Sequence, residues 1–296
     1  MCRTSAVAWR FVACDLCGAD DAAVVHRERV GYFGEELSFT IVRCRGCGLV
    51  YTNPRLAESN AVYLEDEPDV EAIEGHAKAK AAVFTKALDR IERLRGGGTG
   101  ARLLDVGCGS GHFVAAARQR GYEATGLEPA GAYARYAREV LGLEVEAREA
   151  TEAELEEERF DVVTAFDVLE HVESPAGVME RVASWLRPGG VFAGRFPSAR
   201  FHRLKAAVLH GLLHSGRSVY APTMHLTFFD VETFERLARQ VGLEVVEART
   251  TRLEANTASW WLNGAKRAAQ AGLWAARGVT GREWGNLEVY CRKVER

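Results

Sequence analysis

The stretch Asp105-Val-Gly-Cys-Gly-Ser-Gly-His-Phe113 decides the fold of this chain of 296 residues. It follows the apolar pair Leu103 and Leu104, so a short buried strand is predicted to end in an acid and three alternating glycines. Residues 113–120 then favour a helix. A strand, a glycine-rich turn and a helix form the front of a nucleotide-binding βαβ unit, because glycines let the backbone approach a ligand and the helix N-terminus faces it. The chain is therefore predicted to be an α/β protein.

The spacing of the glycines and the acid before them indicate the kind of ligand. The glycines follow the pattern Gly-x-Gly-x-Gly, whereas dinucleotide-binding proteins use Gly-x-Gly-x-x-Gly. An acid at position 105 would repel a pyrophosphate but suits a ligand that carries an ammonium group. With its flanking strand and helix, the segment closely resembles motif I of the class I S-adenosylmethionine-dependent methyltransferases. The resemblance implies that the loop holds the methionine part of the cofactor, through Asp105, Gly107, Cys108, Gly109 and Gly111.

Two later strands extend the resemblance. Residues 122–127 form a second predicted strand that ends at Glu128, which lies 21 residues after Gly107. An acid at this position of a doubly wound sheet hydrogen-bonds the ribose hydroxyls. A fourth predicted strand, residues 160–166, leads into Asp167-Val-Leu-Glu-His-Val172, which resembles the segment that many small-molecule methyltransferases carry at the methyl end of the cofactor. The resemblance therefore adds Glu128, Pro129, Phe166 and Asp167 to the expected cofactor site.

The remaining elements follow in the order of the same fold. Residues 133–141 predict a helix and residues 143–147 a third strand, and Leu186-Arg-Pro-Gly-Gly190 matches the turn into the fifth strand. A last helix and two last strands are expected at 231–240, 243–248 and 287–292. The resemblance covers about residues 70–296 and implies a seven-stranded, doubly wound, Rossmann-like methyltransferase sheet.

Four of the seven cysteines form two knuckles, Cys14-Asp-Leu-Cys17-Gly and Cys44-Arg-Gly-Cys47-Gly. Such a pair is typical of a zinc ribbon, in which four thiolates surround one zinc ion tetrahedrally. A pair of disulfides is the alternative, and a reducing compartment disfavours it. Because four cysteines close the metal shell, the zinc is expected to be structural, held by Cys14, Cys17, Cys44 and Cys47.

These observations predict three segments. A zinc ribbon occupies residues 1–60. A linker with an amphipathic helix occupies 61–100, where apolar residues recur at steps of three and four up to a glycine run, and the family resemblance implies that this helix lies over the cofactor cleft. The methyltransferase domain occupies 101–296. No run reaches the ~18 apolar residues of a membrane-spanning helix. Arg10 interrupts the short apolar stretch before Cys14, which argues against a signal peptide, so a cytoplasmic location is expected.

Two stretches interrupt the minimal sheet and are expected to form a lid, at about 198–229 and 251–283. Residues 198–229 and 255–282 contain no Asp or Glu but hold eight arginines and lysines, in a chain whose net charge is −3. Focused positive charge over a cleft favours a substrate with a carboxylate or phosphate. An ordinary basic surface is the alternative. The cations are Arg200, Arg203, Lys205, Arg217, Lys266, Arg267, Arg277 and Arg282.

Two histidines are candidates for catalysis. Methyl transfer needs a base only where the acceptor carries a proton at neutral pH, as a hydroxyl does, and histidine titrates near that pH. The resemblance places His225 close to the cleft and His171 one turn past the methyl end, so His225 is the first candidate and His171 the second. Structural roles are the alternative for both. The Asp167-x-x-Glu170-His171 spacing also resembles the magnesium ligands of some relatives whose first residue is Glu, and the Asp here disfavours that metal.

The sequence therefore predicts a methyltransferase that uses S-adenosylmethionine and acts, at oxygen, on a small or carrier-linked metabolite. One alternative is an RNA-modifying enzyme that grips RNA with its zinc ribbon. Residues 1–60 hold seven basic and seven acidic residues, which makes nucleic acid an unlikely partner. A second alternative is a binding protein that keeps the cofactor fold without turnover, although the glycine loop is intact.

Overall fold

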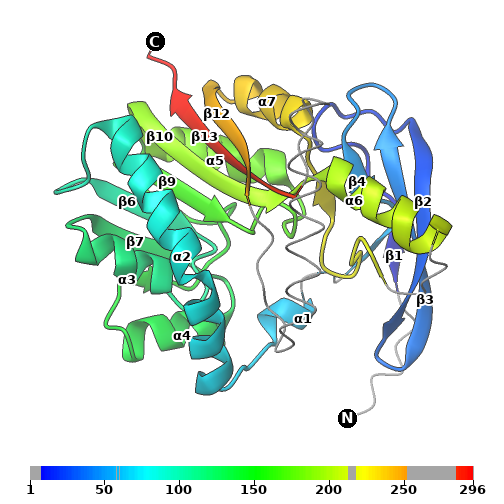
Figure 1. Ribbon diagram of the computed structural model, residues 1–296, viewed down its shortest axis with the longest axis horizontal. Coiled ribbons are helices and arrows are strands. Elements are labelled where there is room, and N and C mark those ends of the chain that lie inside the picture. The colour runs from blue at the N-terminus through cyan, green and yellow to red at the C-terminus, as the bar shows by residue number, and fades with distance from the viewer. Residues whose placement is uncertain (1–7, 58, 60, 213–217, 252–284, 296) are drawn as a thin grey trace.

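The computed structural model describes residues 8–57, 59, 61–212, 218–251 and 285–295 (Figure 1). Its largest feature is a seven-stranded sheet of order β12-β13-β10-β9-β6-β7-β8, in which β8, β7, β6, β9 and β10 are parallel and β13 is antiparallel to both neighbours. This order confirms the predicted methyltransferase sheet. The strands are β6 (Arg102–Val106), β7 (Glu123–Leu127), β8 (Val145–Glu146), β9 (Phe160–Phe166), β10 (Leu186–Pro197), β12 (Leu243–Thr251) and β13 (Asn286–Lys293).

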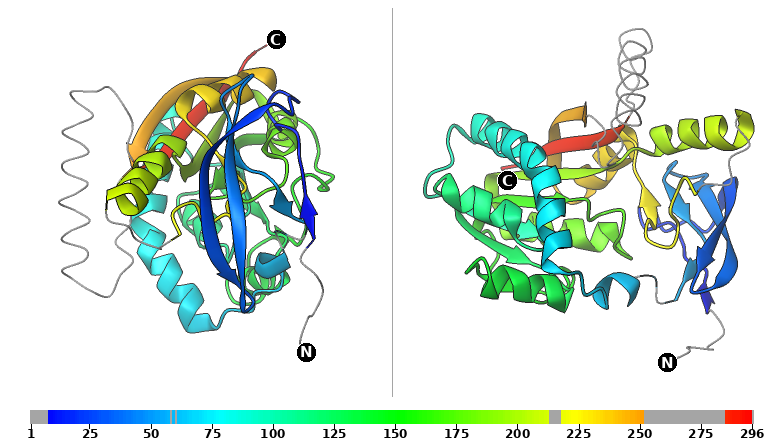
Figure 2. Two further views of the ribbon diagram at one scale, coloured as in Figure 1. Left: turned by 90° about the vertical axis from the view of Figure 1, so that its right-hand side faces the viewer. Right: turned by 60° about the horizontal axis from the view of Figure 1, so that its bottom comes forward.

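Helices cover both faces of this sheet (Figures 1 and 2). Successive strand residues point to opposite faces. Leu103 and Val162 accordingly pack in one core with α2 (Val70–Arg95), α3 (His112–Gln119) and α4 (Gly131–Glu139). Their neighbours Leu104 and Val163 pack in a second core with α5 (Pro175–Trp185) and α7 (Val231–Gln240). Burial on both faces explains why β6 has two adjacent leucines and β9 two adjacent valines where a half-exposed strand would alternate.

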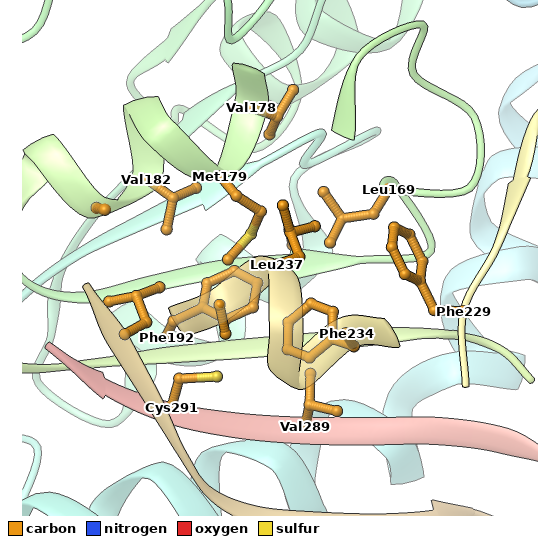
Figure 3. Close-up of a cluster of buried hydrophobic side chains, with 14 of the residues drawn as sticks. Leu169, Val178, Met179, Val182, Phe192, Phe229, Phe234, Leu237, Val289 and Cys291 are labelled. Carbon is orange, nitrogen blue, oxygen red and sulfur yellow. The ribbon is translucent and has the colours of Figure 1, made fainter. Parts of the chain in front are cut away.

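Figure 3 shows the second core between α5, α7 and the sheet. Phe234 of α7 stacks on Phe192 of β10 at 6.3 Å between ring centroids and lies 5.0 Å from Phe196. Met179 of α5 is fully buried against the same cluster. Side chains of this size contribute roughly 1.5–3 kcal/mol each when fully buried, so this layer fixes both helices on the sheet.

Helix α2 ends where the glycine run predicts. Asp69 caps its N-terminus by accepting a hydrogen bond from the Ala72 amide at 2.7 Å. Gly96 follows the last turn with φ +83°, a left-handed conformation that favours glycine. The third strand is shorter than predicted, because only Val145 and Glu146 pair with β7.

The cysteine-containing segment forms a four-stranded antiparallel sheet of order β11-β4-β3-β2. Its strands are β2 (Ala22–Tyr32), β3 (Glu35–Cys44), β4 (Val50–Thr52) and β11 (Thr227–Phe228), and β1 (Trp9–Arg10) pairs separately with β5 (Arg55–Leu56). Strand β11 lies far along the chain, between α6 and α7, so residues 227–228 complete the sheet of the N-terminal segment. The boundary near residue 60 therefore stays a prediction, since this sheet takes a strand from both sides of it.

The two lid stretches differ in how much of them is described. In the first, α6 (Ala199–Ala206) and a π-helical turn η1 (Ala207–Leu212) follow β10, and Ile41, Val50, Tyr220 and Phe228 pack with α6 in a third apolar cluster. The second lid, predicted at 251–283, lies outside the described residues except for Thr251. Within the ranges that the structure covers, no helix has the length and apolar character that a membrane crossing requires.

Cys108 packs against β7, and this contact can be tested by a double-mutant cycle. A Cβ atom at Gly126 would lie 2.4 Å from the Cys108 sulfur. We expect Gly126→Ala to lower the free energy of unfolding by about 1–3 kcal/mol through overpacking. Adding Cys108→Ala should restore at least half of that loss in urea titrations. If Gly126→Ala lowers the free energy of unfolding equally in the presence of Cys108 and of Cys108→Ala, this packing role is contradicted.

Candidate functional site

The glycine loop after β6 is shaped by a close contact with the loop after β9. Gly107 has φ +64°, and a Cβ atom there would lie 2.5 Å from a methyl group of Val168. A side chain at this position would therefore be strained in its backbone and would clash. Gly109 also has a positive φ, at +54°. A Cβ atom at Gly111 would lie 2.6 Å from a methyl group of Leu143.

A cavity of about 640 Å³ opens at the carboxyl ends of the parallel strands. This is where doubly wound sheets bind ligands, and its size suits a nucleoside cofactor. Of the predicted site residues, Gly107, Glu128, Pro129, Asp167 and His171 line it. The other lining residues are Ser59, Tyr63, Leu64, Val106, Leu127, Arg148, Glu149, Ala150, Thr151, Val168, Val172, Glu173, Ser174, Val178 and Met224.

The remaining predicted cofactor residues lie behind this wall. Asp105 is buried, and its carboxylate accepts a hydrogen bond from the Thr164 hydroxyl at 2.6 Å. Burial, opposed by the Thr164 hydrogen bond and reinforced by nearby Glu128, raises the pKa of Asp105 to about 7. Phe166 packs on Phe113 with 5.0 Å between ring centroids. These residues support the loop from the core, as does the buried Cys108.

Glu128 is the best-defined polar group of the cavity. It is fully buried, and its two oxygens accept hydrogen bonds from the backbone amides of Gly109 at 2.7 Å and Ala130 at 2.8 Å. The Tyr63 hydroxyl donates a third hydrogen bond at 3.1 Å. Burial raises the pKa of Glu128, and these donors oppose the rise by stabilising the carboxylate. The glycine loop and the acid at the tip of β7 therefore form one hydrogen-bonded unit.

Sequence reasoning missed two parts of this wall. Tyr63 lies on the short helix α1 (Ala61–Leu64), which shows no pattern that indicates a site. Residues 148–151 follow β8 and line the cavity. Their position gave a usable signal, because the carboxyl ends of neighbouring parallel strands meet at one edge of the sheet.

At the other end of the cavity, Asp167 has a strained backbone and two cationic partners. Its φ is +57°, which is uncommon for a residue other than glycine. Lys80 of α2 bonds one carboxylate oxygen at 2.6 Å, and Arg195 of β10 lies 3.4 Å from the other. Burial alone would raise the pKa of Asp167, but Arg195 and Lys80 hold it below its usual range. Both oxygens therefore face cations of the chain.

His171 and His225 are neighbours, with 4.8 Å between their ring centroids. His171 lines the cavity and its Nδ1 lies 3.1 Å from the Met224 carbonyl oxygen, whereas His225 is not among the cavity-lining residues. Burial lowers the pKa of His171. Burial, with His171 and His202 nearby, lowers the pKa of His225 to about 3. Burial therefore favours the neutral form of both rings.

Glu170 completes this cluster. It is 2% exposed, and burial together with Asp167 holds its pKa well above its ordinary value. Glu170, His171 and His225 each place one possible ligand atom within 4.8 Å of the others, so the cluster could hold a divalent cation. Asp167 is not a member of this group, consistent with its ion pairs to Lys80 and Arg195.

The four predicted metal ligands meet away from this cavity. The sulfurs of Cys14 and Cys47 are 3.4 Å apart, those of Cys17 and Cys44 are 3.5 Å apart, and all four lie within 4.8 Å of one another. Four sulfurs around one zinc at about 2.3 Å would be about 3.8 Å apart, so the set fits a tetrahedral ion. The glycines that close the knuckles, at 18 and 48, both have positive φ, which allows the tight turns.

Comparison with known proteins assigns the family. A model of a methyltransferase domain matches residues 79–248. A ubiquinone biosynthesis O-methyltransferase of Bordetella avium is 35% identical over 183 residues, which are 58% of this chain and 73% of that protein. One of Alkalilimnicola ehrlichii is 38% identical over 123 residues, which are 40% of this chain and 50% of that protein. The chain thus spans about half the length of the first curated relatives it matches.

Solved structures agree on the fold. An S-adenosylmethionine-dependent methyltransferase described as putative from Listeria monocytogenes superposes with a TM-score of 0.52 at 13% identity, covering 74% of this chain and 99% of that one. An S-adenosylmethionine-dependent methyltransferase of Archaeoglobus fulgidus gives 0.51 at 15% identity, covering 72% and 94%. With a glycine loop, an acid at the second strand and a matching domain model, this chain belongs to the S-adenosylmethionine-dependent methyltransferases.

Proposed function

We propose that this protein transfers a methyl group from S-adenosylmethionine to an oxygen atom of a small or carrier-linked metabolite. One observation carries the proposal: a single cavity is lined at once by Gly107 and Glu128 and by His171. The first two are the expected cofactor residues, and the third is a neutral imidazole that can accept a proton. A hydroxyl acceptor needs such a group during transfer.

The charge of the cavity suits this cofactor. Its described lining holds four acids and one arginine, and that arginine lies 3.0 Å from the Glu146 carboxylate. Asp167 is paired with Lys80 and Arg195, and Glu173 lies 2.8 Å from Arg10. Glu128 and Glu149 are therefore the acids that would attract the ammonium and sulfonium groups of S-adenosylmethionine. When bound, it supplies an electrophilic methyl group. The Glu128 carboxylate would accept hydrogen bonds from the ribose hydroxyls in place of the one that the Tyr63 hydroxyl donates to it. The four acids are Glu128, Glu149, Asp167 and Glu173.

The role of the base is assigned to His171. If its Nδ1–H donates to the Met224 carbonyl, Nε2 carries the lone pair that accepts a proton. His225 lies behind this ring and would help to orient it. The names of the relatives from Bordetella avium and Alkalilimnicola ehrlichii, both O-methyltransferases, support oxygen as the acceptor.

The anionic character of the substrate rests on the acid-free stretches. Within the described part of them, Arg200 forms ion pairs with Asp230 and Glu232. Arg203 and Lys205 lie in the last turn of the same helix α6, and the other five cations of these stretches lie outside the described ranges.

We assign the four-cysteine cluster to one structural zinc ion. Four thiolates leave no open coordination position, and none of the four cysteines lines the cavity. The ion would stabilise the N-terminal sheet at the point where Cys14 and Cys44 join the apolar cluster that also contains Trp185 of α5.

Cofactor binding can be measured by calorimetry with S-adenosylhomocysteine. We expect micromolar-range affinity for the wild type and no detectable binding for Gly107→Arg, because the side chain would strain the backbone and fill the cavity. Glu128→Gln should weaken binding by ~10-fold or more, since an amide cannot accept from both backbone donors. Gly34→Arg is the matched control, at another positive-φ glycine with open space around it. The absence of binding heat with the wild type would contradict the assignment of the cofactor.

The base can be tested by turnover with a catechol carboxylate, 3,4-dihydroxybenzoate, in the presence of EDTA and then of Mg²⁺. His171→Gln should lower turnover by ~100-fold or more while S-adenosylhomocysteine still binds. His225→Gln should lower it less, because that ring is not among the lining residues. Equal turnover in wild type and His171→Gln would contradict the assignment. Loss of turnover in EDTA and its recovery in Mg²⁺ would indicate that the Glu170 cluster binds a divalent cation.

Elemental analysis of reduced protein should find one zinc per chain. Cys14→Ser should lose the metal and lower the unfolding temperature, with S-adenosylhomocysteine affinity changed by less than ~3-fold. Cys291→Ser, at a buried cysteine outside the cluster, should keep the full metal content. Metal-free wild-type protein would contradict the zinc assignment.

A further inference from the structure

Arg55 is a buried cation that joins three segments of the chain. It belongs to β5 and is 3% exposed. Its Nη1 donates to the Glu173 carbonyl at 2.8 Å, and its Nη2 lies 3.4 Å from the Leu226 carbonyl oxygen. Nη2 also lies 3.4 Å from the Thr227 hydroxyl, and Nε lies 3.3 Å from the Thr52 carbonyl. One planar guanidinium therefore contacts two loops of the catalytic half from the N-terminal segment.

These two loops carry the histidine pair. Glu173 lies two residues after His171, and Leu226 directly follows His225. The Leu226 amide donates to the Glu170 carbonyl at 2.7 Å, and the Thr52 hydroxyl donates to the His225 carbonyl at 3.0 Å. The relative position of the two imidazoles is thus fixed through their backbones.

Arg55 has no carboxylate within ion-pair distance among the described residues. Burial lowers its pKa, which the more distant charges of Asp15 and Glu173 oppose. A buried cation that is bonded to carbonyl and hydroxyl oxygens contributes little net stability compared with an apolar side chain. Its geometric value is greater, because a guanidinium can hold two carbonyl groups at a fixed separation.

A second contact links the cysteine knuckle to the same loop. Asp15 stands between Cys14 and Cys17, and its carboxylate accepts hydrogen bonds from the Ser174 hydroxyl at 2.8 Å and the Ala176 amide at 2.7 Å. Ser174 is the N-cap of α5 and also lines the cavity. The metal-binding knuckle therefore caps the helix that follows the His171 loop.

We infer that Arg55 is a positioning residue, assisted by Asp15, that holds His171 and His225 in register at the acceptor end of the cavity. The inference rests on the proposed function for its catalytic meaning. The N-terminal unit then governs transfer to the acceptor, whereas Gly107 and Glu128 govern binding of the cofactor. Neither Arg55 nor Asp15 lines the cavity, so each acts through the loops it holds.

The test compares Arg55→Lys and Asp15→Asn with Arg43→Lys in the full chain. Lysine keeps the charge of Arg55 but cannot span both carbonyl groups, and asparagine cannot accept both hydrogen bonds of Asp15. Arg43 is an exposed arginine of β3 whose Nε lies near the Gly48 carbonyl, so it is a matched control within the same unit. The measurements are zinc content, the unfolding temperature, S-adenosylhomocysteine affinity, turnover of 3,4-dihydroxybenzoate, and NMR spectra of ¹³C-labelled histidine.

We expect Arg55→Lys and Asp15→Asn to lower kcat by ~10-fold or more, with cofactor-product affinity within ~2-fold and zinc content unchanged. The imidazole signals of His171 and His225 should shift in both variants and stay in place in Arg43→Lys. Unchanged histidine signals in both variants would overturn the inference, as would affinity and stability falling in proportion to kcat. If the wild type fails to bind S-adenosylhomocysteine or to turn over the probe, the proposed function fails, and the histidine signals alone then decide the positioning role.

Discussion

No side chain fits at position 107, and the ligand end of the sheet is organised around that constraint. The loop after β6 and the loop after β9 approach until a Cβ atom would lie 2.5 Å from Val168. In the same loop, the Gly109 amide donates a hydrogen bond to Glu128 at the tip of the neighbouring strand. The tips of β6, β7 and β9 thus form one wall, and the cavity lies against it. The glycine loop therefore packs on the loop after β9 and is hydrogen-bonded to the acid after β7.

The charges of this wall are arranged unevenly. At the cofactor end, Asp105 and Glu128 are buried acids whose hydrogen bonds come from hydroxyl and amide groups, and burial raises the pKa of both. At the methyl end, Asp167 is held ionised by Lys80 and Arg195. A cationic ligand at the first end would stabilise the ionised forms of Asp105 and Glu128 and would be attracted by their charge. At the second end, Lys80 and Arg195 already balance the charge of Asp167. This difference explains how one cavity can present buried acids to a cationic ligand at one end and an ion-paired acid beside two buried histidines at the other.

The sequence could predict what short-range patterns encode. The strand ending at Val106, the glycine loop, Glu128 and the four cysteines all follow from local spacing, and each lies where its motif indicates. Tyr63, Lys80 and Arg195 could not be predicted, because their roles come from contacts made across large sequence separations. Lys80 meets Asp167 87 residues away, and nothing in the apolar stripe of α2 distinguishes it from a solvated lysine. Which of His171 and His225 lines the cavity could not be predicted either, because it depends on how their two loops pack together.

The N-terminal sheet packs directly against the methyltransferase half, and this contact indicates what the two gain from being joined in one chain. Strand β11 pairs with β4, and Cys14 and Cys44 pack in the same apolar cluster as Trp185 of α5. A unit held only by a flexible linker would not need to bury an arginine against the His171 and His225 loops. Arg55 does bury its charge there, at a cost that neighbouring carbonyl groups only partly offset. The interface is therefore better explained by the geometry it imposes on the His171 and His225 loops than by the stability it adds.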